Sequence, residues 1–91
     1  MGQSRKPFPQ YLGVKLKKIR QCLGLTSYQA MIDHLNIPEA RLYRSSIREY
    51  ETGDRTPSLI VLLRYSEVSG VTINDLVDDR VELDPVLPVQ Q

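Results

Sequence analysis

The sequence predicts an all-α fold of five short helices followed by an extended C-terminal tail. Apolar residues recur at spacings of three and four in several segments, which places them on one face of a helix. Glycine, proline and helix-capping residues separate these segments. With 91 residues, of which 41% are hydrophobic, the chain is expected to bury one modest core and is too short for two.

The first expected helix covers residues 10–23. Its apolar residues, at successive spacings of four, three and four, are Leu12, Leu16, Ile19 and Leu23. The lysines of this segment and Arg20 are expected mostly on the flanks of that apolar stripe. Gly24 then ends the helix, since glycine accepts the left-handed backbone conformation found at many helix C-termini.

The second expected helix begins where Thr26 and, three residues later, Gln29 have the form of a capping box. Its inward residues are Met31, Ile32 and Leu35. Residues 36–39 interrupt the pattern, because the residue before Pro38 is pushed out of the helical region. This stretch either forms a loop to about Tyr43 or caps another turn of helix, and the loop is favoured.

The third expected helix, residues 44–51, is polar on its outer side. Ile47 and Tyr50 share a face with Tyr43 and are expected to point inward. The residues left for the outer side are Arg44, Ser45, Ser46 and Arg48. Residues 52–57 contain glycine and proline and are expected to form a turn.

Two further helices and a tail complete the chain. Ser58 caps the fourth helix and Gly70 stops it. The residues of this helix that are expected to point inward are Leu59, Leu62, Leu63 and Ser66. Thr72 caps a short fifth helix, whose apolar residues are Ile73, Leu76 and Val77. In residues 80–91 apolar and acidic residues alternate and prolines recur, which predicts an extended acidic and apolar tail.

Charge is distributed unevenly along the chain, although its net charge is only +1. Residues 1–56 contain ten lysines and arginines against five acidic residues, whereas residues 57–91 contain two arginines against six acidic residues. This asymmetry fits a protein that meets phosphate at one end and carries an acidic tail at the other.

Several classes of function lack support in the sequence. The longest apolar run, residues 59–63, is far shorter than the roughly 20 residues of a membrane span, and the first residues do not resemble a secretory signal. We therefore expect a cytoplasmic protein with no membrane contact. A single Cys22 and a single His34 offer neither a disulfide, nor a metal site, nor a nucleophile with its base. We expect no enzyme and no cofactor.

The order of these segments resembles the Cro/XRE family of helix-turn-helix proteins, which have the lambda-repressor-like fold. The stretches that carry the resemblance are LKKIR at 16–20 with GL at 24–25, IREYETG at 47–53, TPSL at 56–59 with LL at 62–63, and VTINDL at 71–76. The resemblance extends from Leu12 to about Asp79. It divides the chain into a flexible basic arm (1–9), a helix-turn-helix domain (10–79) and the tail (80–91).

The resemblance implies sequence-specific binding of double-stranded DNA by a transcriptional regulator, most simply a repressor located on the nucleoid. The recognition helix is then the one at about 44–51, which lies in the major groove. Arg44 and Arg48 are the expected readers of bases, since arginine grips guanine through two hydrogen bonds, with Ser45 and Ser46 in a secondary role. The residues expected to hold the DNA backbone are Tyr28, Gln29, Tyr43 and Arg55.

The resemblance also implies a structural ion pair between Arg20 and Glu51. The sequence departs from the family pattern by one extra residue before Met31, which leaves open whether Tyr28 or Gln29 braces the recognition helix. It departs again by about five extra residues between Leu35 and Ile47. This insertion has two possible roles. Either Arg41 contacts DNA, or Ile37 and Leu42 pack over the core, and the second role is favoured.

A single module of this size buries little DNA surface, so a homodimer is expected. The tail offers apolar residues that a monomer can scarcely cover, namely Val81, Leu83, Val86, Leu87 and Val89. Two alternatives remain open, in which the tail folds back on its own domain or binds a different protein. The second would suit a protein-interaction adaptor or the antitoxin of a toxin pair. The arm, with Arg5 and Lys6, is a further candidate for minor-groove contact.

Overall fold

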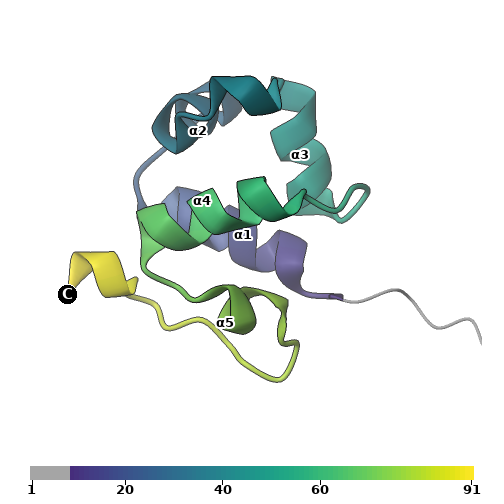
Figure 1. Ribbon diagram of the computed structural model, residues 1–91. Coiled ribbons are helices and arrows are strands. Elements are labelled where there is room, and N and C mark those ends of the chain that lie inside the picture. Colours follow the sequence, from purple (N-terminus) through teal and green to yellow (C-terminus); the bar gives the residue numbers. More distant parts are fainter. Residues whose placement is uncertain (1–8) are drawn as a thin grey trace, which may run out of the picture.

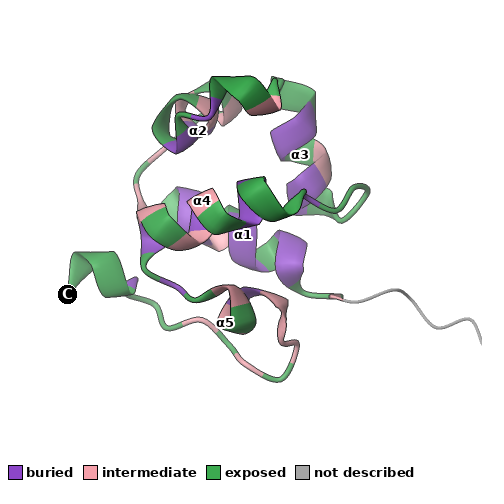
Figure 2. Cartoon of the chain, viewed as in Figure 1, coloured by how far each residue is buried: buried purple, intermediate pink, exposed green. Residues whose placement is uncertain are grey.

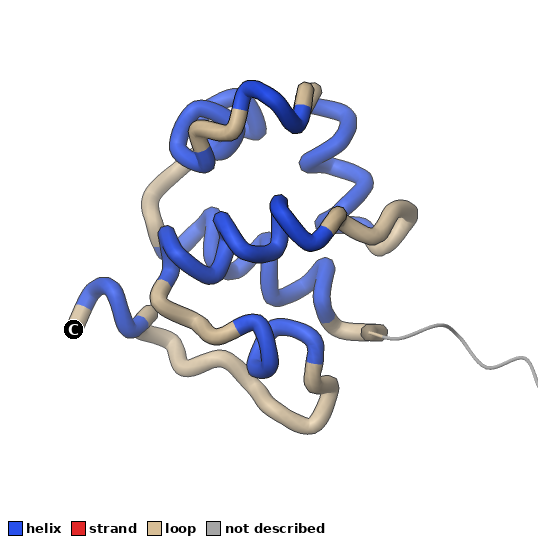
Figure 3. The backbone as a smooth tube through the Cα atoms, in the orientation of Figure 1, coloured by secondary structure: helices blue, strands red, loops and turns tan. Residues whose placement is uncertain are grey.

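The computed structural model describes residues 9–91, and this part of the chain is built from helices and loops without a β-strand (Figures 1 and 3). The elements are α1 (Leu12–Cys22), α2 (Tyr28–Leu35), the 3-10 helix η1 (Pro38–Ala40), α3 (Arg44–Thr52), α4 (Leu59–Ser69), α5 (Ile73–Val77) and the 3-10 helix η2 (Pro88–Gln90). The predicted all-α fold with five helices is confirmed. The predicted arm lies, apart from Pro9, outside the described residues.

Helix α1 is the centre of the fold, because it packs against α3, α4 and α5 (Figure 1). Its stripe of Leu12, Leu16 and Ile19 is buried as the spacing predicts, and Leu23 packs against the edge of the core. After α1, Gly24 takes a left-handed backbone with φ of 76°. No helix in residues 9–91 has both the length and the apolar character that crossing a membrane requires.

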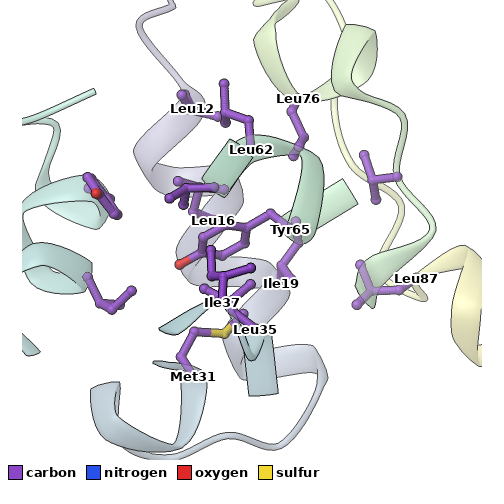
Figure 4. Packing of buried hydrophobic residues seen from close by; sticks show 14 residues of the cluster. Leu12, Leu16, Ile19, Met31, Leu35, Ile37, Leu62, Tyr65, Leu76 and Leu87 are labelled. Carbon is purple, nitrogen blue, oxygen red and sulfur yellow. The ribbon is translucent and has the colours of Figure 1, made fainter. Parts of the chain in front are cut away.

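The core forms where α1, α2, α3 and α4 meet, and its largest fully buried side chain is that of Tyr65. Figure 4 shows the Tyr65 ring among apolar side chains from several helices. The buried apolar residues are Leu12, Leu16, Ile19, Met31, Leu35, Ile37, Ile47, Tyr50, Val61, Leu62, Tyr65, Val71, Leu76 and Leu87. Side chains from distant parts of the sequence therefore share a single core.

Helix α4 turns a different face inward from the one expected. Leu59 and Leu63 are 78% and 40% exposed, so the prediction that they point inward is wrong. The inward side chains are Val61, Leu62 and Tyr65, and Ser66 is only half-buried. The five consecutive apolar residues at 59–63 contain no helical period, so the position of Tyr65 fixes which face of α4 is buried.

Helices α1 and α5 cap each other. The ammonium of Lys15 donates to the carbonyl oxygens of Asp75 (2.6 Å) and Asp78 (2.8 Å) at the C-terminal end of α5. In return, the carboxylate of Asp79 accepts the backbone N–H of Gln10 and of Tyr11 ahead of α1, over 2.9–3.1 Å. Helix ends leave such groups without partners inside the helix. Lys15, which was expected on a flank, is therefore only 5% exposed.

The C-terminal tail packs against its own domain. Leu87 is 1% exposed within the core, and Leu83 is half-buried against it. The amide of Gln90 donates to the carbonyl oxygen of Cys22 (2.6 Å), and Lys18 donates to that of Leu83 (3.0 Å). The prediction that a monomer leaves Leu83 and Leu87 uncovered is wrong, and the alternative in which the tail folds back is the one observed.

Candidate nucleic-acid interface

Helix α3 has sharply defined ends. Tyr43 precedes it with an extended backbone, and the N–H of Tyr43 donates to the hydroxyl oxygen of Ser46 (3.1 Å). Gly53 follows it with a left-handed φ of 85°. The buried side chains of Ile47 and Tyr50 fasten one face of α3 to the core. The opposite side of α3 therefore faces outward, as predicted (Figure 2).

Three of the four α3 residues predicted to face outward are exposed, namely Arg44, Ser45 and Arg48. The fourth, Ser46, is only 4% exposed, so the prediction that it faces outward is wrong. Ser46 is the third residue of α3, a position from which a side chain reaches back to the N–H ahead of the helix. Its hydroxyl is engaged in capping α3.

A buried ion pair joins α1 to the last turn of α3. Arg20 holds Glu51 through two hydrogen bonds, Nε to Oε2 at 2.7 Å and Nη2 to Oε1 at 3.1 Å. The Arg20 Nη1 also donates to the carbonyl oxygen of Leu25 (3.0 Å), and its guanidinium lies 5.1 Å from the centre of the Tyr28 ring. The hydrogen bond to Glu51 raises the pKa of Arg20 above its usual value. The predicted pair is confirmed.

Gly13 lets the backbones of α1 and α3 approach each other closely. A Cβ atom at this position would lie 2.6 Å from the carbonyl oxygen of Glu51 and 2.7 Å from that of Tyr50, which is too close for any side chain. This contact positions α3, and the sequence pattern did not predict it. The available signal was an isolated glycine inside a helical pattern, which usually has a packing reason.

The arginines of residues 9–91 fall into two groups. The arginines in ion pairs are Arg20 with Glu51, Arg55 with Glu49 (3.0 Å), Arg64 with Glu67 (2.6 Å) and Arg80 with Asp78 (3.0 Å). None of the ion pairs within this part of the chain involves Arg41, Arg44 or Arg48. These three side chains are exposed, so the arginines of residues 9–91 that have no carboxylate partner all lie within residues 41–48.

The remaining predicted contact residues lie on three separate segments. Gln29, in the first turn of α2, is exposed, and its amide donates to the carboxylate of Asp33 (3.0 Å). Tyr43 is 68% exposed ahead of α3. Arg55 follows α3 and has a 57% exposed side chain, whereas Tyr28 is half-buried beside Arg20.

The inserted segment between α2 and α3 is mostly loop, but Pro38–Ala40 forms one turn of 3-10 helix, η1, so the alternative of another turn of helix is met in part. Ile37 is 7% exposed, and Leu42 is half-buried against the core. The favoured prediction that these two residues pack over the core is therefore confirmed. Arg41, which lies between them, remains exposed.

Within residues 9–91, no group of histidine, cysteine, aspartate or glutamate side chains is arranged to hold a metal ion. Comparisons with models of known protein families, with curated proteins and with solved structures gave no significant match. Membership of the Cro/XRE family therefore stays a prediction from the sequence. The observed architecture agrees with that prediction at the level of fold class, an all-α domain of five helices.

Proposed function

We propose that this protein binds double-stranded DNA sequence-specifically as a transcriptional regulator, with α3 in the major groove. The observation that carries the proposal is the concentration of unpaired arginines in residues 41–48, while each of the other arginines in residues 9–91 has a carboxylate partner. Unneutralised arginines on one surface attract the phosphates of a duplex and displace its counterions. The repressor role and the location on the nucleoid rest on the family resemblance alone.

The rigid mounting of α3 supports base reading by Arg44 and Arg48. They are four residues apart, so their Cα atoms lie on one side of the helix, separated by a rise of about 6 Å. Buried Ile47 and Tyr50 and the Glu51 ion pair hold the other side of α3. Two arginines held in this way have the reach and the donors to grip guanine edges, each through two hydrogen bonds.

Backbone contacts come from the segments around α3. Arg55 is paired with Glu49 at the surface, and such exposed pairs contribute only about 0–1 kcal/mol, so a phosphate can replace the carboxylate. Gln29 and the exposed Tyr43 supply neutral donors. These contacts fix the position of α3 on the duplex without reading its sequence.

We propose further that two copies bind as a homodimer on half-sites about one helical turn apart, because one small module buries too little DNA for tight binding. Leu87 is buried and Leu83 is half-buried against the protein's own core, so neither residue is free to form the dimer contact. Sedimentation of the full chain with and without a two-site duplex tests the dimer. A single copy on each duplex would contradict it.

The alternative function is that of a protein-interaction adaptor or antitoxin component that docks a partner through the tail. The folded-back tail keeps only Val86 and Val89 as strongly exposed apolar residues, at 49% and 53%. This arrangement favours the DNA-binding proposal, because a docking strip needs more apolar surface than two valines offer.

A salt titration of binding to a random duplex distinguishes the two functions. A DNA-binding protein loses affinity steeply as salt rises, with a slope of about −0.9 for each phosphate neutralised. Replacing both Arg44 and Arg48 by alanine should weaken binding and flatten this slope. The matched control is Arg80→Ala, which removes one arginine paired with Asp78 in the tail and should change neither. Absence of duplex binding at low salt would refute the proposal.

A further inference from the structure

The loop between α2 and α3 has a fixed shape. Ile37 is buried, and Ala40 and Leu42 pack against the core. The N–H of Ala40 donates to the carbonyl oxygen of Ile37 (2.9 Å), and the N–H of Arg41 donates to that of Pro38 (3.0 Å). The backbone of Arg41 is thus held in place by contacts on both sides of it in the sequence.

Arg41 has a backbone conformation that disfavours arginine. Its φ and ψ are 52° and 55°, in the left-handed region, which costs a residue with a Cβ atom about 1–2 kcal/mol. The other left-handed positions of residues 9–91 are occupied by Asn36 and by the glycines at 24, 53 and 70, the residues that tolerate this conformation. Folding stability therefore does not explain an arginine at this position.

The side chain of Arg41 is exposed and takes part in none of the ion pairs formed within the described chain. It lies three residues ahead of Arg44, at the end of α3 that is proposed to read bases. We propose that Arg41 grips a DNA phosphate at the rim of the groove occupied by α3. This inference rests on the proposed DNA-binding function and assigns the inserted loop a part in it.

A phosphate is the partner that the geometry favours over a base. An α-helix with its side chains is about 10–12 Å wide, and the major groove is about 12 Å wide, so α3 leaves no room for a second segment. The loop that carries Arg41 stays outside, where the sugar-phosphate backbone borders the groove. A guanidinium matches the two oxygens of a phosphate through parallel hydrogen bonds. Because the loop is already ordered, binding orders only the side chain.

The test compares Arg41→Gly, Arg41→Asn and Arg41→Lys in the full chain. Thermal unfolding is measured first, and the glycine and asparagine variants should melt no lower than the wild type, since both residues suit the left-handed backbone. Affinity is then measured across a range of salt on two duplexes, the best site selected from a random pool and a random sequence.

The proposal predicts that the glycine and asparagine variants bind both duplexes about tenfold more weakly, as expected for one charge-assisted hydrogen-bonding contact. The salt slope should fall by about 0.9 for each bound copy. Arg41→Lys should keep most of the affinity and the full slope, because it keeps the charge. Arg80→Ala, which also removes one positive charge, should match the wild type.

Three outcomes would overturn the inference. Unchanged affinity and slope for the glycine and asparagine variants, with binding still lost when Arg44 is changed, would reject the Arg41 contact and leave DNA binding intact. A smaller preference for the selected site over the random duplex would indicate a base contact instead of a phosphate contact. Absence of duplex binding by the wild type would reject both the contact and the proposed function.

Discussion

The buried ion pair of Glu51 with Arg20 joins α3 to α1 and contributes to the stability of the fold. Replacing Glu51 by alanine leaves the guanidinium of Arg20 buried without its carboxylate, which typically costs about 3–5 kcal/mol. We therefore expect Glu51→Ala to lower the melting temperature strongly and to perturb DNA contacts less. The control is Glu49→Ala, which breaks the exposed pair with Arg55 and should cost less than about 1 kcal/mol. An unchanged melting temperature for Glu51→Ala would contradict the structural role of the pair.

Tyr65 carries the only buried side-chain polar atom in the described chain without a hydrogen-bond partner, its hydroxyl oxygen. Such a group costs about 1–3 kcal/mol, so Tyr65→Phe should raise the free energy of unfolding by about 1 kcal/mol, measured by urea denaturation at pH 7. Tyr11→Phe, at a 53% exposed position, is the control and should have no effect. A less stable Tyr65→Phe protein would show that the hydroxyl has a partner, such as a buried water.

Burial also makes Tyr65 sensitive to alkaline pH. Desolvation raises the pKa of Tyr65 well above its ordinary value of 10.0. Its contribution to stability is therefore complete below pH 10 and is lost as pH rises above that value, because the unfolded chain ionises first. The stability advantage of Tyr65→Phe should grow between pH 10 and 11. Burial also raises the pKa of Tyr50. The wild type and Tyr65→Phe both contain Tyr50, so each loses the same stability at alkaline pH through that residue.

At the level of single residues, the sequence predicted exposure correctly where the helical period alone decides it. The outward positions of Arg44, Ser45 and Arg48 follow from helical period alone. Ser46 was expected to face outward as well, but it is buried because its hydroxyl accepts the hydrogen bond that caps α3. The buried position of Lys15 depends on α5, which is about sixty residues away in sequence, so no local pattern could predict it.

Between elements, the contact of α1 with α3 depends on the missing side chain of Gly13. Gly13→Ala places a Cβ atom against two backbone carbonyls that cannot move independently of α3. Overpacking of this kind costs about 1–3 kcal/mol, which outweighs the gain of roughly 1 kcal/mol in helix propensity. We expect a lower urea midpoint than that of the wild type. Gln21→Ala, at an exposed position of the same helix, should change the midpoint little, and a Gly13→Ala protein of wild-type stability would contradict the close approach.

The limits of prediction at this scale are clearest in α4. Its boundaries follow from Ser58 and Gly70, which lie at the two ends as expected. Its inward face does not follow, because residues 59–63 are apolar on every side and only the fit of the Tyr65 ring into the core selects one. Helix boundaries are encoded locally, whereas the rotation of an apolar helix is decided by its neighbours.

For the molecule as a whole, the tail is part of the fold. Leu87→Ala should lower the free energy of unfolding by roughly 2–5 kcal/mol, since Leu87 is 1% exposed within the core. Val86→Ala, at a 49% exposed position, should stay within about 0.5 kcal/mol of the wild type. Urea denaturation of both variants measures the difference. Equal stabilities would contradict the folded-back tail.

The sequence predicted the number, order and approximate bounds of the helices, and the Arg20–Glu51 pair followed from the family resemblance. The path of the tail could not be predicted, because alternating apolar and acidic residues with prolines are compatible with several surfaces. The packing of Leu87 becomes evident only once residues from α1, α4 and α5 share the same core. Long-range contacts of this kind are fixed by the assembled fold and not by local pattern.

The central claim is that α3 presents Arg44 and Arg48 to the bases of a duplex. The most direct measurement is the affinity of the wild type, Arg44→Ala, Arg48→Ala and Arg55→Ala for a selected site and for each of its single-base changes. We predict that each α3 variant loses about 1–3 kcal/mol of discrimination at its own base pair, while Arg55→Ala weakens binding to all sequences alike. Uniform weakening by all three variants, with base preference unchanged, would contradict the claim.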